Sequence, residues 1–263
     1  MNIGFIGCGN MATAMLGGIL KNNLVPKENL MASDKSEQAM EKIRRDMGIA
    51  TADNCRVAES ADVLVLAVKP VYMEEVIEEI ADAVRPETIV VTLAPGKTLK
   101  WLDATFGRPT KLVRTMPNTP ALVGEGMTAL CPNEFVQPEE LEQVARIFRS
   151  FGKAQVVSET MIDVVTGISG SSPAYVFLFI EAMADAAVAE GMPRAQAYEF
   201  ASQAVLGSAK MVLETGKHPG ELKDMVCSPG GTTIEGVRVL EEKGLRSAVF
   251  EATRACVKKA REL

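Results

Sequence analysis

The residues best suited to chemistry stand at the beginning of the chain, where an apolar run gives way to glycine. Residues Ile3 to Ile6 lead into Gly7-Cys8-Gly9, and Ala12 completes a G-x-G-x-x-G/A pattern between a predicted strand and a predicted helix. In such a turn the first glycine allows a sharp bend, the second lets a pyrophosphate approach the backbone, and the free N–H groups of the helix attract the anion. The pattern predicts a dinucleotide site; a turn of the same composition that binds nothing is the alternative.

A second candidate group, Ser33-Asp34-Lys35, follows the next predicted strand, which begins at Asn29. A carboxylate at the end of this strand can accept hydrogen bonds from the adenosine ribose hydroxyls, which favours NADH. It would repel the 2′-phosphate of NADPH, although Ser33 and Lys35 can receive that group. Asp34 is equally suited to cap a helix predicted over residues 36–46, so both roles stay open.

Two polar, glycine-containing stretches in the second half, Thr166 to Pro173 and Ser228 to Thr233, each precede a predicted helix. Free N–H groups at a helix start can receive a carboxylate, and Ser171 and Ser172 add hydroxyls in the first stretch. Either stretch alone is equally well explained as a capping loop. Together with a nucleotide site they predict a small anionic substrate.

The sequence shows no Ser-His-Asp, Cys-His or paired-carboxylate arrangement, and its one histidine, His218, lies between helix breakers. We predict a structural role for His218. Hydride transfer from a reduced nicotinamide to a protonated imine needs orientation and little acid–base help, so a reaction of this kind agrees with the residues present.

The elements that position these residues alternate between strand and helix. Continuous apolar runs at 62–68 and 88–93 are typical of parallel strands covered on both faces, and 111–115 is a further strand. Helical spacing lies between the first two, at 73–84. This alternation predicts a doubly wound, mostly parallel α/β sheet whose ligands bind at the carboxyl ends of the strands. By this topology four residues fall on the ligand edge: Lys69, Pro70, Ala94 and Asn118.

The pattern changes after these strands. Two last short strands are predicted at 129–131 and 154–157, and from Thr160 onward only helical spacing remains. The predicted helix 174–190 carries apolar residues over a wide surface, so we expect it to be buried on more than one side. A helical segment with such a helix at its centre is expected to complete its core with a second chain.

Composition restricts the partners and the location. The 263 residues carry a net charge of −6, which disfavours nucleic acid and anionic membranes as partners. Five cysteines, an odd number without a Cys-x-x-Cys pair, indicate reduced thiols, and the single histidine argues against a metal site. No signal-peptide pattern is present, and the charges of Glu181, Asp185 and Glu190 argue against a membrane span. We therefore expect a cytoplasmic protein.

Several motifs, in order along essentially the whole chain, resemble those of the pyrroline-5-carboxylate reductases. They are Phe5-Ile-Gly-Cys-Gly-Asn-Met11, Ala67-Val-Lys-Pro70, Met116-Pro-Asn-Thr-Pro120, Thr166-Gly-Ile-Ser-Gly-Ser-Ser-Pro-Ala-Tyr175, and His218-Pro-Gly-Glu-Leu-Lys-Asp224 followed by Ser228-Pro-Gly-Gly-Thr-Thr233. The resemblance implies reduction of 1-pyrroline-5-carboxylate to L-proline by NADPH or NADH, the last step of proline synthesis. It also implies an N-terminal Rossmann domain, residues 1–158, and an all-α C-terminal dimerisation domain, residues 159–263, which forms dimers and often decamers.

The resemblance also implies roles for individual residues, by their positions in the motifs. The coenzyme is expected to contact Ile6, Gly7, Cys8, Gly9, Asn10, Met11, Ser33, Asp34, Lys35, Asn54, Ala67, Val68, Lys69, Pro70, Ala94 and Asn118. The substrate is expected to contact Ser171, Ser172, Pro173, Gly231, Thr232 and Thr233. Ser171 and Thr233 are the implied catalytic residues. The Ser171-Ser172 turn receives the carboxylate, and the Thr233 hydroxyl hydrogen-bonds the ring nitrogen.

Two departures from the family pattern concern fine contacts. Gly170-Ser-Ser-Pro173 stands where family members commonly have Gly-Ser-Gly-Pro, and Ala94-Pro95-Gly96 stands where Ala-Ala-Gly is frequent. Two other functions are alternatives: a β-hydroxyacid dehydrogenase and a non-catalytic nucleotide-binding sensor. The first class resembles this chain in its domains but carries a lysine on the central C-terminal helix, and Ala174 to Gly191 contains none. The second would leave both predicted anion loops without a ligand.

Overall fold

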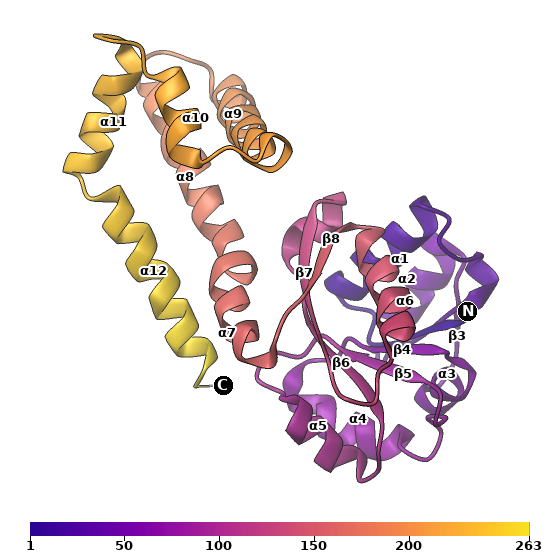
Figure 1. The fold of residues 1–263 in the computed structure, drawn as a ribbon. Coiled ribbons are helices and arrows are strands. Elements are labelled where there is room, and N and C mark those ends of the chain that lie inside the picture. Colours follow the sequence, from indigo (N-terminus) through magenta and orange to yellow (C-terminus); the bar gives the residue numbers. More distant parts are fainter. Residues whose placement is uncertain (263) are drawn as a thin grey trace. The chain divides into compact units, whose positions relative to one another are not determined.

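The computed structural model describes residues 1–262, which form two compact units. The first unit comprises Met1–Ser171 together with the described residues from Cys256 onward, and the second comprises Ser172–Ala255. An eight-stranded sheet with flanking helices makes up most of the first unit, and helices make up the second (Figure 1). This confirms the predicted fold class, an α/β Rossmann-like domain followed by an all-α domain.

The strands are short and lie in the order β3-β2-β1-β4-β5-β6-β7-β8. Their bounds are β1 Ile3–Ile6, β2 Leu30–Ser33, β3 Ala50–Thr51, β4 Val63–Leu66, β5 Ile89–Thr92, β6 Lys111–Met116, β7 Gly126–Pro132 and β8 Gly152–Val156. All neighbours are parallel except β6 and β7, which are antiparallel. The helices of this unit are α1 Asn10–Lys21, α2 Glu37–Met47, α3 Asn54–Ser60, α4 Met73–Ile80, α5 Leu99–Phe106, α6 Pro138–Arg149 and α7 Ile162–Val165.

Strand β1 lies where the winding of the sheet reverses. From β1 the chain adds β2 and β3 on one side, and it then crosses back to place β4, β5 and β6 on the other. Ligands of doubly wound sheets bind beyond the carboxyl ends of the strands at such a point. The glycine turn follows β1 directly, so the fold places it where a dinucleotide is expected.

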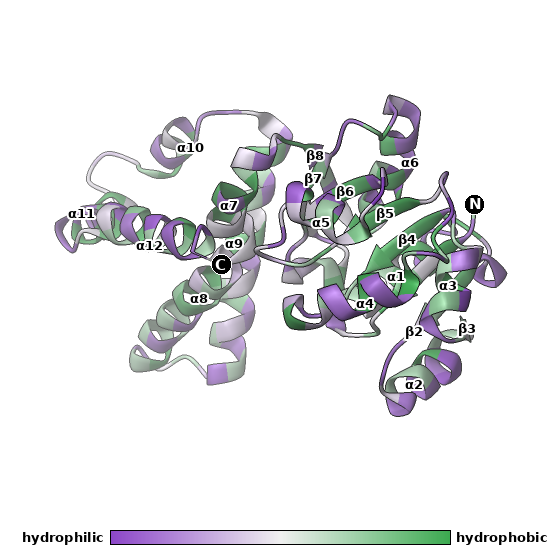
Figure 2. Ribbon diagram, turned by 90° about the horizontal axis from the view of Figure 1, so that it is seen from below, coloured by the Kyte–Doolittle hydropathy of each residue, from purple (hydrophilic) through white to green (hydrophobic). Residues whose placement is uncertain are grey.

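Both faces of the sheet are covered by helices, which explains why the strands are apolar throughout. Every residue of β1, β4 and β5 is buried, and β4 and β5 are coloured as hydrophobic in Figure 2. Because successive side chains of a strand point to opposite faces, neighbours enter different cores. Phe5 packs in a cluster with Met15 of α1 and Phe148 of α6, whereas Ile6 packs in a cluster with Ile77 of α4.

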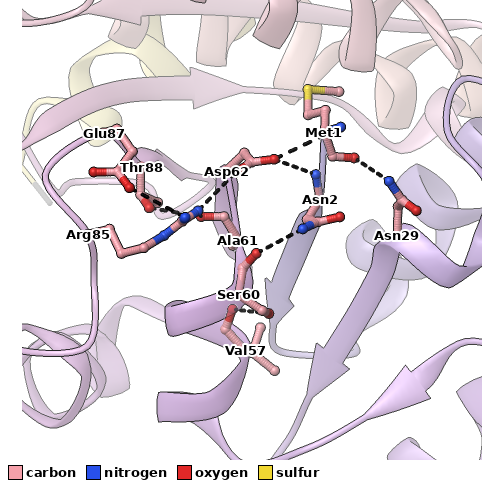
Figure 3. Close-up of polar contacts among 10 residues, drawn as sticks. All are labelled: Met1, Asn2, Asn29, Val57, Ser60, Ala61, Asp62, Arg85, Glu87 and Thr88. Carbon is pink, nitrogen blue, oxygen red and sulfur yellow. Dashed lines mark hydrogen bonds and ion pairs between the residues drawn. The ribbon is translucent and has the colours of Figure 1, made fainter.

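At the amino ends of β1 and β4, away from the predicted ligand edge, Asp62 joins neighbouring segments (Figure 3). Its carboxylate accepts hydrogen bonds from the Asn2 N–H at 2.7 Å and from the Arg85 guanidinium at 2.9 Å. Arg85 and the Thr88 hydroxyl also donate to the carbonyl of Ala61. Although burial opposes ionisation, the donors from Asn2 and Arg85 hold the pKa of Asp62 below its usual value. The ionised Asp62 therefore ties β1 and β4 together at this edge.

A buried ion pair joins β6 to the segment that follows β8. The side chain of Arg114 is 6% exposed, and its guanidinium lies 3.0 Å from Glu159 Oε1 and 3.9 Å from Asp163 Oδ1. The same Glu159 oxygen accepts a hydrogen bond from the Leu99 N–H at 2.7 Å. Since Asp163 lies in α7, Arg114 fixes the segment that leads toward Ser171.

Replacing Arg114 by leucine is expected to lower the free energy of unfolding by roughly 2–4 kcal/mol, because a partly buried carboxylate then loses its main partner. The matched control is Arg149→Leu. Arg149 pairs with Glu142 at 2.6 Å, but both side chains are about half exposed, and such a pair contributes at most about 1 kcal/mol. Urea denaturation of the two variants measures the difference. Equal losses would contradict the role given to Arg114.

The helices of the second unit leave much apolar surface uncovered. They are α8 Ser172–Ala189, α9 Arg194–Thr215, α10 Pro219–Val226, α11 Thr232–Glu242 and α12 Leu245–Ala260, whose last residues belong to the first unit. Helices α8 and α9 pack against each other. Of α8 only Ala184 is buried, whereas Phe177 and Leu178 are 62% and 66% exposed. The wide apolar surface predicted for this helix is present, but a single chain does not bury it.

One helical run within the described residues, Glu159–Ala189, is long and apolar enough to cross a membrane by length and composition alone. Helices that pack against other proteins have the same composition, so this is weak evidence for a membrane. Glu181 and Asp185 lie within α8, and charged side chains are costly inside a bilayer. The charges favour a surface that is covered by protein.

Candidate functional site

The turn after β1 has a geometry that requires glycine at position 7. Gly7 adopts a φ of +101°, and a Cβ at this position would lie 2.7 Å from the carbonyl oxygen of Ala67. The Gly7 N–H donates to the carbonyl of Ser33 at 2.8 Å, and the Ala67 N–H donates to the carbonyl of Ile6 at 2.8 Å. The turn is therefore held between the ends of β2 and β4.

The start of α1 is suited to an anion. Gly9 is the N-cap residue, supplies no capping side chain, and is followed by a first turn without an acidic residue. A Cβ at Gly9 would meet nothing within 4 Å, so the space beside the backbone is open here. The N–H groups of a first helical turn and the positive end of the helix dipole favour a phosphate at such a place. These features fit the pyrophosphate of a dinucleotide.

Cys8, between the two glycines, also has its N–H engaged in a hydrogen bond. The N–H donates to Asp34 Oδ2 at 2.7 Å, and the thiol sulfur lies 3.4 Å from the carbonyl oxygen of Ser33. Burial, and to a smaller extent the Asp34 carboxylate, raises the pKa of the Cys8 thiol to about 12. The thiol is therefore protonated at neutral pH, which makes Cys8 a poor nucleophile.

Asp34 joins the glycine turn to the loop after β2. Besides accepting from Cys8, its carboxylate accepts a hydrogen bond from the Ser36 N–H at 2.9 Å. The capping role considered for Asp34 is wrong, because α2 begins at Glu37 and the N-cap position falls on Ser36. The Ser36 hydroxyl accepts from the Ala39 N–H at 3.3 Å. Contact between Asp34 and the adenosine ribose stays a prediction.

Replacing Asp34 by serine is expected to shift the coenzyme preference toward NADPH by about tenfold, or about 1.4 kcal/mol. The reason is that a negative charge is removed from the predicted adenosine end of the site. The ratio of kcat/KM for NADPH and NADH measures the shift. The control is Asp103→Ser, which also removes a negative charge. Asp103 lies in α5 and does not line the cavity at the turn, so this variant should leave the ratio unchanged. An unchanged ratio in the Asp34 variant would rule out a part for Asp34 in coenzyme choice.

A cavity of about 350 Å³ opens at the carboxyl ends of β1, β2 and β4. It is lined by Ile6, Gly7, Gly9, Asp34, Lys35, Asn54, Ala67, Val68, Lys69, Tyr72, Glu75, Val76 and Glu79. The residues from Ile6 to Lys69 in this set are predicted coenzyme contacts, drawn from the glycine turn, the end of β2, the start of α3 and the loop after β4. The structure therefore brings these separate segments together at one place.

A chain of polar side chains continues from this cavity along the end of β2. The Ser33 hydroxyl donates to Asn54 Oδ1 at 2.7 Å, and Asn54 Nδ2 donates to Glu79 Oε2 at 2.7 Å. The Lys35 ammonium lies 3.7 Å from the centre of the Tyr72 ring, and it lowers the pKa of that phenol. A neighbouring cavity of about 480 Å³ shares Asp34, Lys35, Asn54 and Glu79 with the first, and its lining also includes Ser33 and Arg44. This end of the site can therefore offer an adenosine group both acceptors for hydrogen bonds from its ribose hydroxyls and cationic side chains.

Ala94 and Asn118 follow β5 and β6 on the same edge but are not among the residues that line either cavity. Ala94 is buried, and its N–H donates to the Thr92 hydroxyl at 3.2 Å. The Asn118 side chain is also buried and is hydrogen-bonded at both ends of its amide. Their predicted place at the carboxyl ends of the strands agrees with the fold.

The stretch before α8 is neither a capping loop nor a helix start with free N–H groups, the two alternatives that the sequence leaves open. Thr166–Gly170 is a π-helical turn between α7 and α8, and the Ser171 N–H donates to the carbonyl of Thr166 at 2.8 Å. Pro173 gives a physical reason: it has no N–H to donate and its ring crowds the carbonyl four residues earlier, so the helix widens here instead of starting anew. The Ser171 N–H is therefore not free for an anion. The hydroxyls of Ser171 and Ser172 lie on half-buried residues.

The second stretch does precede a helix, as predicted. Gly231 is the N-cap residue of α11 and supplies no capping side chain. The turn before it contains Gly230 at a φ of +66°, and the Gly231 N–H donates to the carbonyl of Ser228 at 3.0 Å. Thr233 lies in the first turn of α11 and is half-buried. The start of α11 thus combines helix N–H groups with the hydroxyls of two threonines.

The single histidine has a structural role, as predicted. His218 Nδ1 accepts a hydrogen bond from the Gly220 N–H at 3.0 Å and so caps α10. Within residues 1–262, no group of His, Cys, Asp and Glu side chains is placed to hold a metal ion.

Comparison with known proteins identifies relatives along the whole chain. The family model described as pyrroline-5-carboxylate reductase dimerisation matches residues 159–263, and that described as NADP oxidoreductase coenzyme F420-dependent matches residues 2–96. The pyrroline-5-carboxylate reductase of Escherichia coli (strain K12) is 55% identical over 262 residues, which cover 99% of this chain and 97% of that protein. The chain belongs to the pyrroline-5-carboxylate reductase family.

Solved structures of other pyrroline-5-carboxylate reductases have the same fold. The enzyme of Coxiella burnetii superposes with a TM-score of 0.94 at 37% identity, covering 99% of this chain and 97% of that one. The pyrroline carboxylate reductase of Plasmodium falciparum, solved with NADP bound, superposes with a TM-score of 0.89 at 33% identity. The match covers 100% of this chain and 97% of that one. The likeness therefore extends over both units of the chain.

Four residues that line the reductase's candidate coenzyme cavity were not predicted from the sequence: Tyr72, Glu75, Val76 and Glu79. Glu79 lies on the acidic face of α4, which has the composition of an ordinary solvated face. Tyr72 ends the short 3-10 turn Pro70–Tyr72, directly after the predicted ligand residues. That proximity to Lys69 and Pro70 is the signal that points to Tyr72, whereas Glu79 required the packing of α4 beside α3.

Proposed function

We propose that this chain reduces 1-pyrroline-5-carboxylate to L-proline with NADPH as the hydride donor and NADH as a second donor, in the last step of proline biosynthesis. The observation that carries the proposal is the open helix start behind the glycine turn, in a chain related over its full length to pyrroline-5-carboxylate reductases. This reaction needs two ligands held in a fixed orientation and no metal.

The residues at the turn fit the coenzyme. Gly9 leaves open space beside the backbone, and the start of α1 is suited to a pyrophosphate. When bound, NADPH supplies the hydride. We assign the pyrophosphate to the segment Ile6 to Met11, the adenosine end to Ser33, Asp34, Lys35 and Asn54, and the nicotinamide end to Ala67, Val68, Lys69, Pro70 and Ala94.

The substrate is assigned to the two polar stretches. The Ser171 and Ser172 hydroxyls donate hydrogen bonds to its carboxylate, and the Thr233 hydroxyl accepts one from the N–H of the protonated ring nitrogen. Pro173, Gly231 and Thr232 border the ring. Because the imine is already protonated, these residues have to orient it and keep it charged, and no side chain has to transfer a proton.

The alternative enzyme class, a β-hydroxyacid dehydrogenase, needs a proton-transferring lysine on the central helix. Helix α8, Ser172–Ala189, has none. A sensor without activity would explain the glycine turn but would give no ligand to the start of α11. Both alternatives predict a different outcome in one assay.

The assay follows NADPH absorbance with 1-pyrroline-5-carboxylate, and NAD(P) reduction with 2-hydroxy acids. Oxidation of NADPH by the imine, with L-proline as the product, is the expected result. Turnover of the hydroxy acids in place of the imine would support the dehydrogenase. Coenzyme binding without turnover of any of these compounds would support the sensor.

We further propose that the exposed helical surface forms dimers, that dimers associate into decamers, and that the enzyme is cytoplasmic. A groove of about 710 Å³ between α11 and α12 supports the first of these. Its apolar lining includes Val237, Leu240, Leu245, Val249 and Phe250, none of which is a predicted coenzyme or substrate residue. Sedimentation of the full chain distinguishes monomer, dimer and decamer.

A further inference from the structure

Asn118, just after β6, uses both ends of its side-chain amide within the first unit. Its Nδ2 donates to the carbonyl of Ser169 at 3.0 Å, and its Oδ1 accepts from the Met127 N–H at 2.8 Å. The residue is only 9% exposed. One buried amide thus connects β7 with the π-helical turn Thr166–Gly170.

Pro173 explains why the carbonyl of Ser169 needs such a donor. In a regular helix the N–H of residue 173 would donate to the carbonyl of residue 169, and proline has no N–H. Ser169 is half-buried, and a carbonyl that is shielded from water and left without a donor is costly. Asn118 supplies a donor from the loop after β6, so the π turn is stabilised by a side chain outside the helix.

A second contact holds the same turn against the end of β6. Gly170 lies so close to Met116 that a Cβ on Gly170 would be 2.8 Å from Met116 Cε. The next residue, Ser171, is hydrogen-bonded through its N–H to Thr166 at the other end of the turn. A shift of the turn would therefore move Ser171 as well.

We infer that Asn118 is a positioning residue for the substrate, which fixes the π turn to the carboxyl edge of the sheet and so holds Ser171 and Ser172 in place. This inference rests on the proposed function, in which these two serines receive the substrate carboxylate. It replaces the coenzyme contact implied for Asn118 by the family resemblance. Its effect is on the imine and on L-proline, and not on NADPH.

Asn118→Asp tests the inference, with Asn133→Asp as a matched control. Aspartate keeps the size and the acceptor but cannot donate to Ser169 when ionised. Asn133 makes the same two kinds of bond at the other end of β6: its Nδ2 donates to the carbonyl of Thr110 at 2.8 Å, and its Oδ1 accepts from the Leu112 N–H at 3.1 Å. The control therefore has the same chemistry and a similar loss of stability, away from the ligand edge.

We expect Asn118→Asp to raise the KM for 1-pyrroline-5-carboxylate and the Kd for L-proline by about tenfold or more. The change in kcat should be smaller, and the NADPH Kd should stay within about twofold of wild type. Asn133→Asp should lower Tm and leave all of these constants within about twofold. If either aspartate variant does not fold, Asn118→Ser and Asn133→Ser make the same comparison.

Two results would overturn the inference: an Asn118 variant that loses NADPH affinity as much as imine affinity, or Asn118 and Asn133 variants that differ from wild type in Tm alone. Failure of the proposed function is recognised separately, because wild-type enzyme would then not oxidise NADPH with the imine.

Discussion

Gly7→Ala is expected to lose about 100-fold or more in NADPH affinity, or about 2.7 kcal/mol, and to unfold more easily by roughly 2–4 kcal/mol. Position 7 has a φ of +101°, which an L side chain rarely adopts. The added Cβ would also lie 2.7 Å from the backbone oxygen of Ala67, which cannot move without displacing β4. Both effects force the turn out of the conformation that presents the start of α1.

Two other glycines of the same segment serve as controls for Gly7. At Gly9 a Cβ would meet no protein atom within 4 Å and the backbone has a φ of −71°, so Gly9→Ala should keep its stability and lose coenzyme affinity alone. At Gly17, inside α1, a Cβ also meets nothing within 4 Å. Gly17→Ala should therefore leave the NADPH affinity unchanged and leave the free energy of unfolding unchanged or slightly raised. Fluorescence titration with NADPH and urea denaturation measure these outcomes. Full NADPH affinity in Gly7→Ala or in Gly9→Ala would contradict the assignment of the turn.

Thr233→Ala is expected to lower kcat by about 100-fold, or about 2.7 kcal/mol, with the NADPH Kd unchanged. Thr233 lies in the first turn of α11, whose N-cap residue, Gly231, supplies no capping side chain. The hydroxyl is proposed to hold the N–H of the ring nitrogen, whose charge disappears as the hydride is transferred to the neighbouring carbon. Loss of this contact affects orientation of the imine and leaves the coenzyme residues untouched.

Thr233→Ser is the matched variant, because it keeps the hydroxyl and removes only a methyl group. It should recover most of the activity lost in the alanine variant. Steady-state kinetics with the imine and equilibrium binding of NADPH separate the two effects. A parallel loss of kcat and coenzyme affinity in Thr233→Ala, or no recovery in the serine variant, would contradict the role given to the hydroxyl.

The sheet and its ligand edge could be predicted because parallel strands buried on both faces have a continuous apolar composition. The runs at 62–68 and 88–93 contain β4 and β5, and the glycine turn follows β1 as expected. The direction of β7 could not be predicted, since a short strand such as 129–131 has the same composition whether its neighbour is parallel or antiparallel. Helix α3, Asn54–Ser60, was also missed, because seven residues give little periodicity.

The coenzyme residues were easier to predict than the shape of the substrate turn. Gly7 and Gly9 are identified by backbone requirements that act within a few residues. The π turn at Thr166–Gly170 depends instead on contacts with Asn118 and Met116, which lie about fifty residues earlier in the chain. Local sequence suggests a loop there, because Gly167, Gly170 and Pro173 are all helix breakers.

The role of Asp34, the acidic residue after β2, could not be decided from the local sequence either. Both Asp34 and Ser36 are good capping residues by type, and only the observed start of α2 at Glu37 decides between them. The bond from the Cys8 N–H to Asp34 crosses between the ends of two strands. No spacing rule within either segment predicts that contact.

The most direct test of the proposed chemistry is a crystal structure of the full-length protein with NADPH and L-proline bound. We predict the proline carboxylate within hydrogen-bonding distance of the Ser171 and Ser172 hydroxyls, the ring nitrogen at the Thr233 hydroxyl, and the pyrophosphate at the start of α1. A carboxylate bound away from both serines, or a pyrophosphate bound away from Gly9, would contradict it.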